Sequence, residues 1–153
     1  IKNIASIHLV IIGSGPQENN IREFIKELDV IDKVTMLGHR DDIDKILPSL
    51  DIFVLPSKME ALGTSILEAS ACGVPCVGSK VGGIPECIED GVSGLLFESG
   101  DVEDLKNKIE VLIYDKKRRE EFGKNARELV LEKFSTERMI QDTQRLYDGV
   151  MVF

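Results

Sequence analysis

Two glutamates that stand eight positions apart, Glu60 and Glu68, are the residues of this sequence whose type and spacing best suit chemistry. A turn of small residues, 63–65, lies between them, and a helix is predicted over 64–72. Free N–H groups at a helix N-terminus bind phosphate, and ionised carboxylates accept hydrogen bonds strongly from hydroxyl groups. The stretch therefore suits a ligand that carries both phosphate and sugar.

Both glutamates also have a purely structural interpretation. The run from Ser65 to Glu68 fits the capping-box pattern S-x-x-E, in which the Glu68 carboxylate accepts a hydrogen bond from the Ser65 backbone N–H. Glu60 could be no more than a solvated loop charge. Geometry decides between the two interpretations, because a Glu68 side chain that bonds the Ser65 N–H is not available to a ligand.

The composition is that of a single acidic globular domain. The 153 residues are 42% hydrophobic and 30% charged, with a net charge of −8, so the chain lacks the basic face that nucleic acid or an anionic membrane attracts. The three cysteines, Cys72, Cys76 and Cys87, form no C-x-x-C pair and are expected to be free thiols in a reducing, cytoplasmic compartment. With only His8 and His39 to assist them, no metal site is expected.

No signal peptide is visible, and no apolar run reaches the roughly 20 residues that a membrane span requires. The chain begins at Ile1, without a methionine, and soon enters an apolar run. We therefore expect it to be a fragment of a longer protein.

Predicted strands and helices alternate along the chain, which is typical of βαβ units and a mostly parallel, doubly wound, Rossmann-like sheet. Strands are expected in short apolar runs, one at the start of 6–16 and the others within 33–38, 51–57, 75–79 and 95–101. Helices are expected at 18–30, 40–50, 64–72, 101–113, 116–132 and 136–148, and turns at 81–94. We find no linker that divides the chain. Because ligands bind beyond the carboxyl ends of such strands, the loops of interest are 13–16, 38–40, 56–63 and 79–85.

Two weaker motifs are better explained by structure than by binding. GSGPQE follows a strand and precedes a helix, but Glu18 replaces the third glycine of G-x-G-x-x-G, so a tight turn is favoured over a dinucleotide site. DDID at 41–44 resembles a metal-binding D-x-D, but aspartates at a helix start cap its N–H groups and complement its dipole.

The order of motifs resembles that of the retaining GT-B glycosyltransferases related to glycosyltransferase family 4, the group 1 transferases. The resemblance rests on LPS before Glu60, on the E-x7-E spacing, and on LEASACGVPCVGSKVGGIPECIEDGVSGLLF from residue 67 onward. HLVIIGSGP and VTMLGHRDDIDKILPSLDIFVLPS upstream match as well. Several motifs in order are far more specific than any one of them. The resemblance implies that residues 1–153 are the nucleotide-sugar-binding C-terminal domain, one half of a GT-B fold, with C-terminal helices.

The resemblance also implies a role for each site residue. Glu60 would face the donor sugar and stabilise positive charge at the anomeric carbon, which makes it the expected catalytic residue. Glu68 would accept hydrogen bonds from the ribose, and the backbone N–H groups of Gly63 and Thr64 would hold the distal phosphate. The loop 38–40 would border the base. The other expected donor-binding residues are Gly13, Gly15, Gly38, His39, Arg40, Ala61, Leu62 and Ser65.

The sequence departs from the family pattern in what it contains and in what it lacks. Ala61 and Leu62 replace the usual Gly-Phe, which bears on sugar preference more than on catalysis. The family's G-R-x-x-x-x-K-G segment and its N-terminal acceptor domain are missing. The lost strand would be central in a doubly wound sheet, so we expect a defect there. We also expect an exposed apolar face at Met139, Leu146 and Tyr147, where the family's last helix packs toward the partner domain.

We therefore expect the full-length parent to be a glycosyltransferase of the hexosyltransferase type that acts in polysaccharide or glycolipid biosynthesis. We expect the fragment itself to be inactive. No cofactor is expected, because the nucleotide-diphosphate sugar is a substrate. Any membrane contact of the parent is expected outside this domain. The alternative is the nucleotide-sugar-binding module of another GT-B-like enzyme such as an epimerase, although the sequence offers few of the extra acids that an epimerase needs. A phosphorylase would need a cofactor lysine that the sequence does not place.

Overall fold

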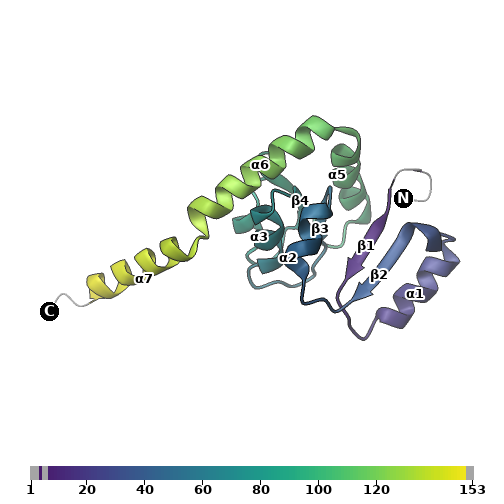
Figure 1. Cartoon of the computed structure of the whole chain (residues 1–153), viewed down its shortest axis with the longest axis horizontal. Coiled ribbons are helices and arrows are strands. Elements are labelled where there is room, and N and C mark those ends of the chain that lie inside the picture. Colours follow the sequence, from purple (N-terminus) through teal and green to yellow (C-terminus); the bar gives the residue numbers. More distant parts are fainter. Residues whose placement is uncertain (1–3, 5–6, 151–153) are drawn as a thin grey trace. The chain divides into compact units, whose positions relative to one another are not determined.

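The computed structural model describes residue 4 and residues 7–150, and it divides the chain into two compact units, 1–43 and 44–153. No change of composition marks the boundary in the sequence. The units are described one at a time below, and Figure 1 gives their elements.

The first unit is a single βαβ motif. Strand β1 (Leu9–Ile12) runs parallel to strand β2 (Val34–Gly38), and helix α1 (Glu18–Glu27) makes the crossover before a short 3-10 turn at Ile31–Lys33. Leu9 faces Val34, but the register shifts after Ile11 so that Ile12 faces Gly38. The shift ends the strand pair at two glycine-containing loops.

The second unit carries a three-stranded parallel sheet in the order β3-β4-β5. Its strands are β3 (Phe53–Leu55), β4 (Cys76–Ser79) and β5 (Gly94–Phe97). Its helices are α3 (Thr64–Ala71), α4 (Ile84–Cys87), α5 (Val102–Tyr114), α6 (Lys116–Lys133) and α7 (Thr136–Val150). Helix α2 (Ile43–Ile46) and a 3-10 turn at Leu47–Ser49 precede β3. Helices α3, α5 and α6 pack against the sheet (Figure 1).

Within the described residues, the strands form two separate sheets instead of one continuous sheet. Strand β1 pairs only with β2, and β3 pairs only with β4. The expected α/β fold with parallel strands is therefore confirmed, and the described strands do not form one continuous sheet. The expected loss of a central strand stays a prediction.

The core of the second unit lies between its sheet and its long helices. The buried cluster contains Val77, Leu95, Phe97, Leu112 and Phe122, of which Val77 and Leu112 have no exposed surface. These side chains come from β4, β5, α5 and α6 and hold those elements together through apolar contact. The cluster fixes the strand ends from which the site loops emerge.

Helices α3 and α6 approach each other closely at a pair of glycines. Gly73 ends α3 with a positive φ of 77°, its N–H donates to the Ser70 carbonyl, and the Val74 N–H donates to the Ala69 carbonyl. Gly123, inside α6, lies so near that a Cβ atom there would overlap the Gly73 carbonyl oxygen. The helices can pack at this distance only because position 123 has no side chain.

Aspartates cap the helices α5 and α6. The Asp101 carboxylate accepts a hydrogen bond from the Asp104 N–H at 2.9 Å, and the Asp115 carboxylate accepts one from the Arg118 N–H at 2.9 Å. Each cap satisfies a backbone donor that the first helical turn leaves free. The start of each helix is therefore encoded locally.

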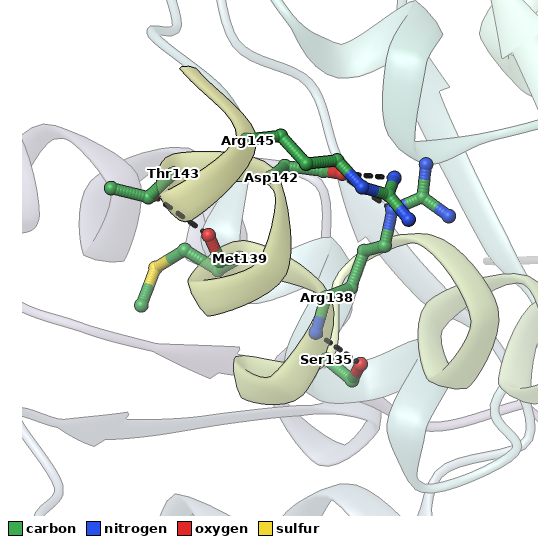
Figure 2. Close-up of polar contacts among 6 residues, drawn as sticks. All are labelled: Ser135, Arg138, Met139, Asp142, Thr143 and Arg145. Carbon is green, nitrogen blue, oxygen red and sulfur yellow. Dashed lines mark hydrogen bonds and ion pairs between the residues drawn. The ribbon is translucent and has the colours of Figure 1, made fainter. Parts of the chain in front are cut away.

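Helix α7 is exposed along its described length, and its polar contacts among the described residues are within the helix or with Ser135 just before it (Figure 2). Arg138 donates to the Asp142 carboxylate at 2.7 Å, Arg145 donates to the same carboxylate at 3.2 Å, and the Thr143 hydroxyl donates to the Met139 carbonyl at 2.7 Å. The expected exposed apolar side chains are present: Met139, Leu146 and Tyr147 are 62%, 67% and 66% exposed. In the part of the chain that the structure describes, no helix is both long and apolar enough to cross a bilayer.

Candidate functional site

The loop that carries Glu60 lies at the carboxyl edge of the β3-β4-β5 sheet. Strand β3 ends at Leu55 and helix α3 begins at Thr64, so the residues between them cross the edge where parallel α/β sheets bind ligands. Gly63 is the N-cap of α3, and its φ of 92° turns the loop into the helix. The predicted loop and the start of the predicted helix are both confirmed.

The structure does not support the capping-box interpretation of Ser65 and Glu68, which is the alternative to a ligand-binding role for Glu68. The N-cap of α3 is Gly63, two residues before Ser65, and no side chain caps the helix. The Gly63 carbonyl accepts hydrogen bonds from the Ile66 and Leu67 N–H groups. The N–H groups of Gly63, Thr64 and Ser65 have no acceptor in the described chain. These three consecutive backbone donors lie at the helix N-terminus, where such groups bind anions. Thr64 is exposed and Ser65 is half-buried, whereas Gly63 is buried.

The Glu68 carboxylate is exposed and makes no hydrogen bond or ion pair with another described residue. Its structural explanation required a bond to the Ser65 N–H, and that bond does not form. Glu68 lies in the second turn of α3, on the same helix as the free N–H groups. Its carboxylate is therefore available to accept hydrogen bonds from a ligand.

The Glu60 side chain is half-buried and folds back onto its own loop. Its carboxylate accepts a hydrogen bond from the Ala61 N–H at 3.0 Å and a long one from the Ser57 hydroxyl at 3.5 Å. The Ser57 carbonyl in turn accepts a hydrogen bond from the Ser79 hydroxyl at 2.7 Å. No described lysine or arginine forms an ion pair with Glu60, so the carboxylate is held by neutral donors alone.

The loop at 79–85 lies against the loop of Glu60. The Gly83 N–H donates to the Ala61 carbonyl at 2.9 Å. The turns expected over 81–94 contain one element that the sequence did not reveal, the short helix α4 at Ile84–Cys87. Pro85 lies in its first turn, where the missing N–H costs nothing, so the proline starts this helix and does not break it.

In the first unit, the G-x-G turn lines a cavity of about 220 Å³ at the end of β1. Gly13 has a φ of 121°, and its N–H donates to the Gly38 carbonyl at 2.7 Å. The cavity wall is mostly apolar and is formed by Ile11, Ile12, Gly13, Ser14, Gly15, Gln17, Glu18, Ile21 and Met36. Gly13 and Gly15 therefore lie in the turn that follows a strand, as expected.

The loop after β2 is held by charged side chains. Arg40 donates two hydrogen bonds to the Asp42 carboxylate, at 2.8 and 2.6 Å, and His39 lies 3.2 Å from the Asp41 carboxylate. The hydrogen bonds from Arg40 lower the pKa of the Asp42 carboxyl, and Asp42 raises the pKa of Arg40. Neither aspartate accepts a hydrogen bond from an N–H of α2 in the described structure, so the expected capping by Asp41 or Asp42 is wrong.

The expected site residues therefore form two groups, one in each unit. The group in the first unit is Gly13, Gly15, Gly38, His39 and Arg40. The group in the second unit is Glu60, Ala61, Leu62, Gly63, Thr64, Ser65 and Glu68. Both groups lie at the carboxyl ends of parallel strands or in the loops that follow them, except for Thr64, Ser65 and Glu68, which lie in helix α3. Among the described residues, no three His, Cys, Asp or Glu side chains are placed to hold a metal ion.

Two of the three thiols are inaccessible. Cys76 and Cys87 are buried, whereas Cys72 is partly exposed. Burial raises the pKa of the Cys76 thiol to about 12, and burial together with the charges of Glu86 and Glu60 raises the pKa of Cys87 to about 11. Both thiols therefore stay protonated at neutral pH and are poor nucleophiles.

We expect one thiol of the folded chain to react with Ellman's reagent at about pH 8, and all three thiols to react in denaturant. Cys72 is the residue that reacts first. Mass spectrometry of the alkylated, folded chain identifies it. Rapid labelling of Cys87 in the folded state would contradict the buried position of that thiol.

Comparison with known proteins places this α/β domain in a family. A family model described as glycosyl transferases group 1 matches residues 1–129. The chain therefore belongs to the group 1 glycosyl transferase family.

Its relatives are longer enzymes. The chain is 37% identical over 143 residues to the N-acetyl-alpha-D-glucosaminyl L-malate synthase of Bacillus anthracis, covering 94% of this chain and 38% of that protein. The structure of Anabaena Alr3699/HepE in complex with UDP-glucose has a TM-score of 0.87 and 27% identity, and covers 95% of this chain and 42% of that one. The chain thus spans about two fifths of the length of these relatives.

A third similar structure is itself a single domain. The C-terminal domain of the group 1 family protein LpcC from Francisella tularensis has a TM-score of 0.79 and 27% identity. The match covers 88% of this chain and 73% of that domain. The Rossmann-like fold predicted for the chain is therefore confirmed by solved structures of the same family.

Proposed function

We propose that this chain is the donor-binding C-terminal domain of a retaining glycosyltransferase. The observation that carries the proposal is the set of three free N–H groups at Gly63, Thr64 and Ser65, with the Glu60 and Glu68 carboxylates on either side in the sequence. The similarity to a structure that holds UDP-glucose supports a nucleotide-diphosphate sugar as the ligand.

Each part of the site meets one part of the donor. The free N–H groups bind the distal phosphate and offset its negative charge, together with the arginine and lysine that the family's G-R-x-x-x-x-K-G segment would supply in the parent enzyme. Glu68 accepts hydrogen bonds from the ribose hydroxyls. The loop of Gly38, His39 and Arg40 borders the base. Neither a metal nor a cofactor is required by these contacts.

Glu60 is the proposed catalytic residue. When the bond between the anomeric carbon and the distal phosphate oxygen breaks, positive charge develops on the sugar, and the carboxylate stabilises that charge. The bonding electrons leave with the nucleoside diphosphate, whose new negative charge falls on the helix N–H groups. The acceptor oxygen bonds the anomeric carbon on the face that the diphosphate leaves, and its proton passes to the departing diphosphate oxygen. The sugar therefore keeps its configuration.

Two neighbouring residues adjust which sugar fits. Ala61 and Leu62 stand where the family usually has glycine and phenylalanine, so this loop offers an aliphatic side chain where an aromatic one is common. An aromatic ring presents a broader apolar wall to a sugar than leucine does. We therefore attribute differences in sugar preference to this pair and not to the glutamates.

The rest of the protein supplies what this chain does not. The acceptor is bound by an N-terminal domain, which also completes the cleft, and the parent enzyme acts in the cytoplasm in polysaccharide or glycolipid synthesis. Any membrane contact of that enzyme lies outside this domain. The isolated chain consequently binds the donor nucleotide but transfers no sugar.

Titration calorimetry with UDP, GDP and ADP tests the proposal. At least one nucleoside diphosphate should bind, and its parent nucleoside should bind far more weakly, because the nucleoside has no phosphate for the three N–H groups. NMR spectra should show the amide signals of Thr64 and Ser65 moving on binding. If none of the three diphosphates binds, or if the nucleoside binds equally well, the proposed site is wrong. Measurable sugar transfer by the isolated chain would contradict its proposed inactivity.

A further inference from the structure

The loop of Glu60 rests on a second segment, residues 82–87, which we call the brace. Residues 82–87 contain the glycine pair 82–83 and helix α4, and they follow β4 by a few positions. Each residue of the loop 60–63 contacts a residue of the brace, either by a hydrogen bond or by direct packing. No residue of the brace is among those proposed to bind the donor.

The glycine pair allows the two backbones to touch. Gly82 has a φ of 53°, and a Cβ atom there would overlap the Glu60 carbonyl oxygen. A Cβ atom on Gly83 would lie 2.7 Å from the Ala61 carbonyl oxygen and 2.9 Å from the Leu62 Cα. Both distances are too short for a real side chain, so the brace and the loop pack with no space between them.

Side chains of α4 complete the contact. Ile84 has no exposed surface, and its Cγ1 would be 3.2 Å from a Cβ atom on Gly63. The Cys87 thiol, which is 1% exposed, donates a hydrogen bond to the Leu62 carbonyl oxygen at 3.2 Å. Because this thiol is protonated at neutral pH, it acts as a hydrogen-bond donor and not as a nucleophile.

The position of the Leu62 carbonyl matters because of the peptide plane. The carbonyl of Leu62 and the N–H of Gly63 belong to one rigid, trans peptide group and point in opposite directions. The group that holds the carbonyl therefore sets the direction of the Gly63 N–H. A hydrogen bond to the carbonyl also polarises the peptide and strengthens its N–H as a donor.

We propose that Cys87 is a positioning residue, which acts through the Leu62–Gly63 peptide to aim the Gly63 N–H at the distal phosphate of the donor. This inference rests on the proposed function of the site. Cys87 does not touch the ligand. Its effect is confined to phosphate binding, because the base and the ribose are bound by other residues.

The test compares Cys87→Ala, which removes the donor, with Cys87→Ser, which keeps one. UDP affinity should fall roughly threefold to tenfold in Cys87→Ala, the loss that one modest hydrogen bond gives, and Cys87→Ser should recover most of it. Uridine affinity should be the same in all three proteins. In NMR spectra of the free protein, the Gly63 amide proton should shift in Cys87→Ala and return toward its original position in Cys87→Ser.

Cys76→Ala is the matched control, because Cys76 is an equally buried thiol whose sulfur contacts Ser70 and backbone carbonyls of Val74 and Ile66 but no residue of the loop 60–63. It should lower stability and leave UDP affinity unchanged. The proposal is overturned if Cys76→Ala weakens UDP binding as much as Cys87→Ala, or if Cys87→Ala leaves UDP affinity at the original value. If GDP or ADP is the diphosphate that the original protein binds, it replaces UDP in these measurements. If none of the three binds, the proposed function fails, and an unmoved Gly63 amide in Cys87→Ala would separately overturn the positioning role.

Discussion

Replacing Glu68 by alanine is expected to weaken UDP binding to the chain by roughly 10- to 100-fold, the value of hydrogen bonds to a charged acceptor. The carboxylate has no partner in the described chain, so the change removes contacts with the ligand and none with the protein. Titration calorimetry measures the loss. Glu68→Gln keeps an oxygen acceptor without the charge. Its UDP affinity should lie between that of the original chain and that of Glu68→Ala.

Glu128→Ala is the control, because Glu128 is an exposed carboxylate on α6 whose contact in the described structure is a loose ion pair with Lys124. It should leave UDP affinity unchanged. Stability separates the two interpretations of Glu68. A carboxylate in a capping box would lower the unfolding free energy by about 1 kcal/mol when removed, whereas a ligand-binding one leaves it nearly unchanged. A stability loss without an affinity loss would therefore sink the ligand role of Glu68.

Gly123→Ala is expected to have the largest effect on stability. The added Cβ atom overlaps the Gly73 carbonyl oxygen and must push α6 away from α3. Such overpacking costs about 1–3 kcal/mol, even though alanine is favoured over glycine inside a helix by about 1 kcal/mol. Urea unfolding followed by circular dichroism measures the change.

Gly149→Ala provides the opposite case in the same chain. Gly149 lies in α7, and a Cβ atom added there would meet no other atom within 4 Å, so only the helix preference remains. This variant should be as stable as the original chain or slightly more stable. Equal effects of the two substitutions would mean that the contact between α3 and α6 does not limit side-chain size at position 123.

The regular elements could be predicted because their signals are local. Local sequence marks the limits of the apolar strands β3, β4 and β5 and of the aspartate-capped helices. Helices α5, α6 and α7 begin and end within two residues of the predicted ranges. The two separate sheets also agree with the interruption of the sheet that the motif order led us to expect.

The details of the site could not be predicted in the same way. The S-x-x-E pattern pointed to Ser65 as the helix cap, but Gly63 ends the loop two residues earlier because it can adopt a positive φ. The pattern therefore described a side-chain bond that does not form in the structure. Helix α4 was missed because Gly82, Gly83 and Pro85 are typical of turns, and proline at a helix start has the same local signal.

The contact between Gly82 and the Glu60 carbonyl also has an evolutionary consequence. Two segments about twenty residues apart in the sequence are locked by shape, so neither can change alone. A mutation that adds a side chain at position 82 or 83 must displace the loop of Glu60. Natural variants are therefore expected to explore new sugar preferences through the side chains of Ala61 and Leu62, while the two glycines stay fixed.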